Sequence, residues 1–339
     1  MKNIRTNKFI VITTINSPSD AVRKYTGWGD WKVVVVGDRK TPSDWDCSGV
    51  TYLGIDKQYE EFDEISRLIP ESTYTRKILG YLYAIRHGAD VIFETDDDNI
   101  PYANAPDKIA SLLSMADRAA FPRLNSESGW INIYNYFGAK RCWPRGFPIE
   151  QLKSPKSAGQ PGKDTKPWGV VQFLADEDPD VDAVYRMVDG SPVYFARDRE
   201  CILDEGTFGP INSQATLWTK ESFPLLFLPL GVPDRVTDIL RGYIALSCLW
   251  KFDRSVGYCS PIVYQKRNIH NLFNDFQQEM SIYCNANAWS KVLMGIEGRN
   301  LQGLYISAIQ KLSACGAMSE ENIHTYKMFL QAANISVNV

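Results

Sequence analysis

Short apolar runs punctuate the chain at regular intervals, with polar turns and amphipathic stretches between them. Residues 9–14 (F-I-V-I-T-T), 31–36 (W-K-V-V-V-V) and 91–95 (V-I-F-E-T) are rich in β-branched side chains and end at polar turns. Such runs predict buried strands. Strands that alternate with helices indicate βαβ units, so we expect an α/β fold with a mainly parallel sheet flanked by helices.

The clearest predicted helix covers residues 72–88, where apolar side chains recur at helical spacing. Ser72 is suited to act as its N-cap, and Gly88 stands where a glycine commonly ends a helix. Gly80 inside the helix costs about 1 kcal/mol relative to alanine, which indicates close packing against a neighbour.

Later apolar segments extend the same pattern. Residues 169–174 and 224–230 are predicted strands, and Pro233 opens another predicted helix. Two amphipathic helices are predicted at 301–312 and from Ser319 onward. The chain of 339 residues therefore divides into a main domain at 1–286 and a C-terminal helical appendage at 287–339.

Three consecutive aspartates, Asp96, Asp97 and Asp98, follow the predicted strand at 91–95 and precede an Asn/Pro turn. Open α/β sheets bind ligands at the carboxyl ends of their strands. Mg²⁺ and Mn²⁺ prefer oxygen ligands, and Mg²⁺ is bound by one or two carboxylates together with substrate phosphates. The run thus indicates a divalent-metal site, and the alternative is a solvated acidic turn or helix N-cap cluster.

Charged residues on two predicted helices are further candidates. Arg76 and Lys77 lie near the start of the helix at 72–88, where they either bind a diphosphate or form a solvated face. Asp234, Asp238 and Arg241 share one face of the helix after Pro233. That trio is either a surface ion pair or a general base held by a guanidinium.

Overall composition excludes some classes of protein. The net charge is −3 and no basic run is present, so nucleic acid is not an expected partner. The seven cysteines lack C-x-x-C spacing, which favours free thiols in a reducing compartment. The first residues lack the apolar core of a signal peptide, and no apolar run reaches membrane-spanning length. We expect a cytoplasmic protein without a transmembrane span, and peripheral contact with a membrane stays open.

Several ordered motifs between residues 11 and 250 resemble the STELLO-type glycosyltransferase family. They are V-I-T-T-I-N-S-P-S-D-A-V, W-K-V-V-V-V-G-D-R-K-T-P-S-D-W, Y-T-R-K-I-L-G-Y-L-Y-A-I-R-H-G-A-D, F-E-T-D-D-D-N, D-P-D-V-D-A-V-Y-R, N-S-Q-A-T-L-W and R-V-T-D-I-L-R-G-Y. A fainter likeness joins the chain to UDP-arabinose mutases, the reversibly glycosylated proteins, which also pair D-D-D with a later P-D-x-D-A. The resemblance implies a GT-A-like, Rossmann-related fold that grips a nucleotide-sugar diphosphate through Mn²⁺ or Mg²⁺.

The resemblance also implies roles for individual residues. Metal ligands would be Asp96, Asp98 and His270, although a lone histidine is more often structural. Asp238 would be the catalytic base of an inverting transfer, with Asp234 as its competitor. The donor would be bound by Thr13, Thr14, Asp38, Arg76, Lys77, Asp96 and Asp97. Sugar or acceptor contacts would come from Asp180, Asp182, Asn212, Gln214 and Arg241.

The expected function is thus metal-dependent transfer of a sugar from a nucleotide-sugar donor to a hydroxyl acceptor, in cell-surface polysaccharide or glycan synthesis. UDP is the expected nucleotide by analogy, while CMP- and GDP-sugars stay open. A nucleotide-sugar mutase, a self-glycosylating protein and a catalytically silent scaffold of the same fold are the alternatives. A nucleotidyltransferase is disfavoured because I-T-T-I-N-S-P is not a glycine-rich phosphate loop.

Overall fold

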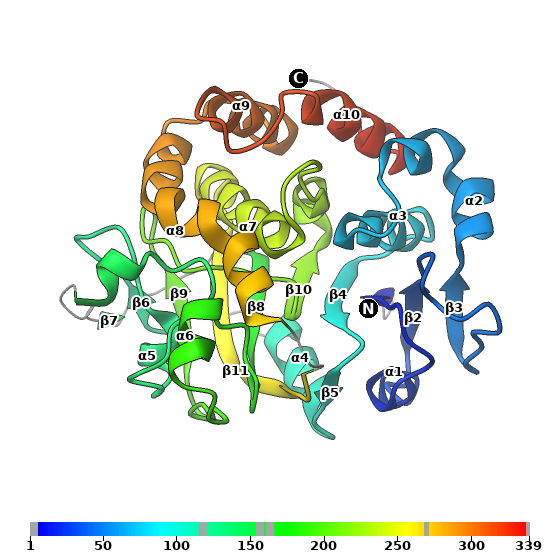
Figure 1. The fold of residues 1–339 in the computed structure, drawn as a ribbon, viewed down its shortest axis with the longest axis horizontal. Coiled ribbons are helices and arrows are strands. Elements are labelled where there is room, and N and C mark those ends of the chain that lie inside the picture. Colours follow the sequence, from blue (N-terminus) through cyan, green and yellow to red (C-terminus); the bar gives the residue numbers. More distant parts are fainter. Residues whose placement is uncertain (1–5, 115–120, 154–158, 161–165, 268–270, 337–339) are drawn as a thin grey trace.

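A computed structural model describes residues 6–114, 121–153, 159–160, 166–267 and 271–336. The described residues build one eleven-stranded sheet with helices on both faces (Figure 1). Its strands are β1 (Lys8–Thr13), β2 (Trp31–Val36), β3 (Val50–Leu53), β4 (Val91–Asp96), β5 (Asn99–Pro101), β6 (Arg123–Leu124), β7 (Gly159–Gln160), β8 (Trp168–Asp176), β9 (Glu200–Leu203), β10 (Ala215–Thr219) and β11 (Ser255–Gln265).

The strand order is β3-β2-β1-β4-β10-β8-β11-β9-β6-β7, and β5 pairs with β11. Strands β1 to β4 are parallel to their neighbours in the order β3-β2-β1-β4, whereas β10 runs antiparallel to both β4 and β8. The order β3-β2-β1-β4 is that of a Rossmann-type sheet, which confirms the expected α/β class. Because β1 is parallel to β2 and β4, Thr13 lies beside Val36 and Asp96 at one carboxyl edge.

Helices cover both faces of this sheet. One buried apolar cluster includes side chains of α1 and α4, and the other includes side chains of α2, α3 and α7–α10. The α-helices are α1 (Asp20–Tyr25), α2 (Ile55–Leu68), α3 (Lys77–Arg86), α4 (Ala105–Ser114), α5 (Ile133–Tyr136), α6 (Ala183–Val188), α7 (Asp234–Lys251), α8 (Leu272–Met294), α9 (Leu301–Ala314) and α10 (Asn322–Ala332). The 3-10 helices are η1 (Tyr74–Arg76), η2 (Ile149–Lys153) and η3 (Lys220–Leu226).

The predicted helix at 72–88 is realised as η1 followed by α3. A Cβ on Gly80 would lie 2.6 Å from Val11 Cγ1, which confirms the close packing of α3 on the sheet. Gly88 has a φ of 76° just beyond the helix, as a C-terminal glycine should. The Ser72 N-cap prediction is wrong, because Ser72 has a φ of 58° and Thr73 precedes the first turn instead.

The predicted strand at 224–230 is also wrong, because the 3-10 helix η3 covers residues 220–226. Leu225, Leu226 and Phe227 are all fully buried, so this run has no polar face to reveal its periodicity. Pro224 also lacks the N–H that a strand needs for its ladder.

The predicted C-terminal helices are present as α9 and α10, and they pack directly on the main body (Figure 1). The Tyr305 hydroxyl donates to the Phe227 carbonyl at 2.7 Å, and the Leu230 N–H donates to Asn322 Oδ1 at 2.7 Å. The expected boundary at 286/287 falls inside α8, which continues to Met294. These helices therefore share a core with the sheet.

Two further features concern the chain as a whole. All seven cysteines are free, as predicted from their spacing. Within the described ranges, none of the helices combines the length and the apolar character needed to cross a membrane.

Candidate functional site

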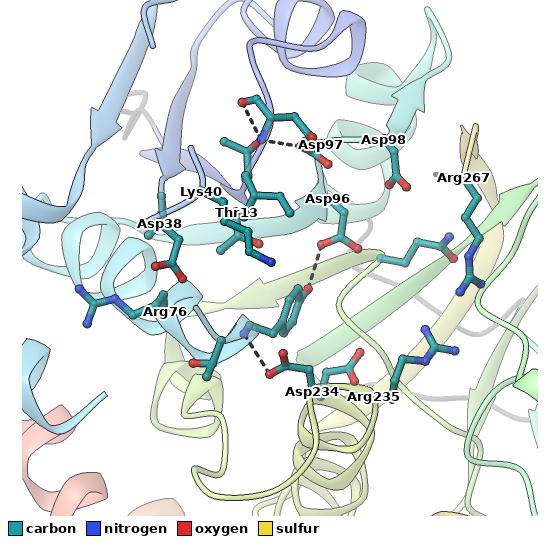
Figure 2. Close-up of a pocket in the computed structure, with 18 of the residues that line it drawn as sticks. Thr13, Asp38, Lys40, Arg76, Asp96, Asp97, Asp98, Asp234, Arg235 and Arg267 are labelled. Carbon is teal, nitrogen blue, oxygen red and sulfur yellow. Dashed lines mark hydrogen bonds between the residues drawn. The ribbon is translucent and has the colours of Figure 1, made fainter. Parts of the chain in front are cut away.

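A cleft of about 760 Å³ opens at the carboxyl ends of β1, β2 and β4 (Figure 2). Its walls also include the first turn of α7 and residues that follow β11. Most of the residues singled out from the sequence line this cleft. They are Thr13, Thr14, Asp38, Arg76, Asp96, Asp97, Asp98, Asp180, Gln214, Asp234 and Asp238.

The three adjacent aspartates have different partners. Asp96 Oδ1 accepts hydrogen bonds from the Tyr74 hydroxyl at 2.8 Å and from Lys77 Nζ at 3.0 Å. Burial raises the pKa of Asp96, although Lys77 opposes that rise. Both of these donors use Oδ1, which leaves Oδ2 for another ligand.

Asp97 holds the loop after β1. Its Oδ2 accepts from the Thr14 hydroxyl and from Asn16 Nδ2, the latter at 3.0 Å. Thr14 and Asp97, both expected to bind donor, are therefore bonded to each other across the cleft edge. Their joint effect is to fix the loop that begins at the end of β1.

Asp98 is the least satisfied of the three. Its Oδ2 accepts from Gln265 Nε2 at 2.9 Å, but its buried Oδ1 has no hydrogen-bond partner among the described residues. Burial, together with the neighbouring charge of Asp96, raises the pKa of Asp98 to about 7. A buried polar atom without a partner is costly, and an ion is one recognised explanation for it.

This arrangement fits a divalent cation that carries its own phosphate ligand. Across the described ranges, no three His, Cys, Asp or Glu side chains gather into a closed metal cage. Mg²⁺ commonly needs only one or two protein carboxylates, because waters and phosphate oxygens fill the remaining positions. Asp98 Oδ1 and the open side of Asp96 offer such a partial set. His270 lies outside the described residues.

Lys77 does not reach the cleft. It is fully buried, and its ammonium group donates to the Tyr74 hydroxyl and the Thr95 carbonyl, each at 2.8 Å, besides Asp96. Neither of the sequence alternatives, diphosphate binding or a solvated face, describes this contact set. Lys77 is instead a buried positioning residue for the Asp96 carboxylate.

Arg76 touches the cleft, but its guanidinium is already committed. Nε donates to Gln58 Oε1 at 2.9 Å, and Nη1 donates to the carbonyls of Ser66 and Ile69 at 2.8 and 3.0 Å. Only 1% of Arg76 is exposed, so it is not part of a solvated face. These bonds join η1 to the end of α2, and we correct the expected donor contact to a structural one.

Asp238 and Asp180 are held by one arginine, Arg145. Its Nη1 and Nη2 each lie 3.0 Å from an oxygen of Asp238, while Nε and Nη2 bind Asp180 at 2.8 and 2.7 Å. All three side chains are nearly buried. Asp238 is thus clamped by a guanidinium, as one sequence alternative required, but the arginine is not the expected one.

Arg241 faces away from the cleft. Its Nη1 and Nη2 bind the two oxygens of Glu94 at 3.0 and 2.6 Å, and both side chains are fully buried. The position at i+3 from Asp238 therefore points Arg241 into the core under β4. We correct its expected sugar or acceptor contact to a buried ion pair.

Asp234 has the most open carboxylate on α7. It begins the helix at the rim of the cleft, and its Oδ1 accepts from the Tyr74 N–H at 3.0 Å (Figure 2). Partial burial raises the pKa of Asp234. Raised basicity combined with an accessible oxygen suits a general base better than the clamped carboxylate of Asp238 does.

The remaining candidates are mostly local structural residues. Asp182 caps α6 by accepting from the Tyr185 N–H at 2.8 Å, and Asn212 Oδ1 accepts from the Gln214 N–H at 3.0 Å. Neither Asp182 nor Asn212 is among the residues that line the cleft. Gln214 does line it, and its Nε2 donates to Gln265 Oε1 at 2.7 Å.

Sequence reasoning missed several cations that line the cleft. These are Lys40, Arg145, Arg186, Arg235 and Arg267. Lys40 lies two residues beyond Asp38 at the end of β2, a position that could have been inferred from the motif G-D-R-K. The four arginines lie far apart along the chain, between residues 145 and 267, and no spacing in the sequence connects them.

Comparison with known proteins places this cleft in context. The chain is 28% identical over 311 residues to the probable glycosyltransferase STELLO2 of Arabidopsis thaliana, an alignment that covers 86% of this chain and 40% of that protein. It is 27% identical over 342 residues to the probable glycosyltransferase STELLO1 of the same plant, with 95% and 43% covered. The chain is a relative of the STELLO-type glycosyltransferases.

The chain spans only about two fifths of the length of these two STELLO proteins. No protein-family model matches the chain. Among solved structures, glucosyl-3-phosphoglycerate synthase from Mycobacterium tuberculosis has a TM-score of 0.43 and 11% identity, over 88% of this chain and 83% of that one. A mycobacterial protein gives a TM-score of 0.45 and 12% identity, over 88% and 78%.

Proposed function

We propose that this chain is a metal-dependent glycosyltransferase that moves a sugar from a nucleotide-sugar donor, UDP-linked by analogy, to a hydroxyl acceptor. The observation that carries the proposal is the buried Oδ1 of Asp98, which lies beside Asp96 at the carboxyl end of β4 and has no hydrogen-bond partner among the residues that the structure describes. Kinship with the STELLO-type glycosyltransferases supports the same reaction class.

The residues around the cleft divide the work of binding. Asp98 and the open side of Asp96 would hold a divalent cation, which when bound neutralises charge on the departing diphosphate. Lys77 and Tyr74 keep Asp96 in place from behind. Asp38 and the loop fixed by Asp97 form the wall at the ends of β1 and β2, where the nucleoside would lie.

Asp234 would accept the proton of the acceptor hydroxyl. Its raised pKa makes it a stronger base than an ordinary surface aspartate, and the Tyr74 N–H orients its carboxylate. A base that activates the acceptor for direct displacement predicts inversion at the anomeric carbon. Asp238, with both oxygens bound to Arg145, would instead stiffen the floor of the cleft.

A thermal-shift screen of UDP, GDP, CMP and their sugars, with and without Mn²⁺, tests this proposal. A ligand present at 100 times its Kd stabilises the folded state by about 2.7 kcal/mol, which corresponds to a clear rise in melting temperature. We expect the rise to require Mn²⁺ or Mg²⁺ and to disappear in Asp98→Asn. If no nucleotide shifts the melting temperature under any metal condition, the proposal is wrong.

A further inference from the structure

Three arginines from separate elements converge on the cleft opposite the aspartates. Arg186 belongs to α6, Arg235 to the first turn of α7, and Arg267 to the segment after β11. Figure 2 shows Arg235 and Arg267 on the side of the cleft away from Asp38. Mutual repulsion is visible in Arg267, since burial and the charges of Arg186 and Arg235 lower its pKa to about 10.

Each of these arginines is anchored from behind by an acid that does not line the cleft. Arg235 Nε binds Glu279 Oε1 at 2.8 Å, and Arg267 Nη2 binds Asp275 Oδ2 at 2.8 Å. Arg186 Nη1 binds Asp178. None of these three acids is among the cleft-lining residues. The acids therefore hold the guanidinium groups in place while the groups themselves face the cavity.

The anchoring bonds leave donors free. In the part of the chain that the structure describes, Nη1 of Arg235 and Nη1 of Arg267 have no hydrogen-bond partner. Nε of Arg186 is buried and likewise lacks a partner among the described residues, while its Nη2 donates to the Pro179 carbonyl at 2.8 Å. Fixed guanidinium groups with spare N–H groups recognise phosphate through paired hydrogen bonds, and pre-organisation limits the entropy lost on binding.

We propose that Arg186, Arg235 and Arg267 form a subsite for a phosphate monoester group carried by the acceptor. A phosphate monoester dianion offers three terminal oxygens, one for each of the three converging guanidinium groups. A carboxylate has only two oxygens and a single charge, so it matches the three groups less well. The subsite adjoins Asp234, the neighbour of Arg235, so a bound phosphate would tether the acceptor beside the base. This inference rests on the proposed function, since only a transferase needs an acceptor.

The same chemistry could come from the diphosphate of the donor, so the test separates the two sources. Binding of inorganic phosphate and of methyl phosphate is measured by ³¹P NMR titration, with Mg²⁺, in the absence and presence of saturating UDP or GDP. We expect phosphate to bind the free protein and to remain bound when the nucleotide is added. Displacement by the nucleotide would overturn the inference, because the arginines would then hold the donor.

Paired substitutions avoid a buried, unpaired acid. Arg267→Gln/Asp275→Asn and Arg186→Gln/Asp178→Asn each remove one cation together with its anchor, whereas Arg67→Gln/Asp63→Asn removes an exposed pair on α2 as the matched control. Loss of a charged hydrogen-bonding partner should raise the Kd for phosphate about tenfold or more, with nucleotide binding unchanged. The control should leave both unchanged.

Three outcomes would overturn the inference. They are absence of phosphate binding to the unmodified protein, an unchanged Kd in both cleft variants, and equal loss of phosphate and nucleotide binding. Failure of the proposed function looks different, because neither nucleotide would bind while the phosphate titration would still report on the arginines. Circular dichroism of each variant confirms that it is folded before its Kd is compared.

Discussion

Asp98 and Asp238 both line the same cleft, yet their surroundings are opposite. One oxygen of Asp98 is bound by Gln265 and the other is buried without a partner in the described structure. Both oxygens of Asp238 are bound by Arg145, and the Ser213 N–H lies 3.3 Å from one of them. A carboxylate with an open oxygen is available to a cation or proton, whereas a clamped carboxylate stabilises the surrounding structure.

The largest expected effect concerns Arg145, which holds the clamped carboxylate of Asp238. Arg145→Met leaves Asp180 and Asp238 buried without their counter-ion, which should lower the free energy of unfolding by about 3–5 kcal/mol. Urea denaturation followed by circular dichroism measures the loss. Arg67→Met, which breaks the exposed pair with Asp63, should cost no more than about 1 kcal/mol. If both variants lost the same free energy of unfolding, the buried pairs of Arg145 would contribute no more to stability than the exposed pair of Arg67.

Substitution of Asp98, the carboxylate with an open oxygen, should affect activity more than folding. Asp98→Asn keeps an oxygen that can accept from Gln265 but removes the charge, so sugar transfer should fall by about 10³-fold. Nucleotide release from the donor identified by thermal shift measures the rate. Asp97→Asn is the matched neighbour, and its loss should stay below about tenfold, the scale of one hydrogen bond. Similar losses in both variants would assign the whole acidic run one shared role.

A third substitution compares the two carboxylates of α7. Asp234→Asn preserves the bond from the Tyr74 N–H, so the melting temperature should hardly change while kcat falls about 10²-fold, as expected on removing a general base. A general base works only in its deprotonated form, and the pKa of Asp234 is raised. As the pH is lowered, the rate of the unmodified protein should therefore begin to fall at a higher pH than it would with an aspartate of ordinary pKa. Full activity in Asp234→Asn would return the role of base to Asp238.

How far the sequence predicts this site depends on how local each feature is. The β1–β4 region was predictable because short apolar runs end in turns, and parallel pairing then brings their ends together. Asp38, Asp96 and Asp98 reach the cleft for that reason alone. The roles of Lys77 and Arg241 were not predictable from helical spacing, since their burial depends on which face packs against β4 and on partners far along the chain.

The second half of the site was hidden from the sequence for a related reason. Arg145 meets Asp238 across 93 residues, and Arg267 follows the end of β11, which pairs with β5 directly after the aspartates. Nothing periodic links these positions. The strand predicted at 224–230 failed for the opposite reason, because complete burial erases the alternation that distinguishes a strand from a helix.

The smallest expected effect is the cost of keeping Asp98 open. Because its pKa is raised to about 7 in the folded protein, Asp98 binds a proton more tightly there than in the unfolded chain. Stability from this group is therefore complete below about pH 4, falls as the pH rises toward 7, and then levels off. Asp98→Asn cannot ionise, so it escapes this loss.

At pH 8, without metal, Asp98→Asn should consequently unfold at a higher urea concentration, with a gain of about 1 kcal/mol after allowance for partial exposure. The difference from the unmodified protein should shrink at pH 4. Excess Mn²⁺ with a bound nucleotide should reverse the order at pH 8, because only the unmodified protein gains stability from the ligand. A variant that is less stable at pH 8 in the absence of metal would show that the open oxygen of Asp98 has a partner of its own.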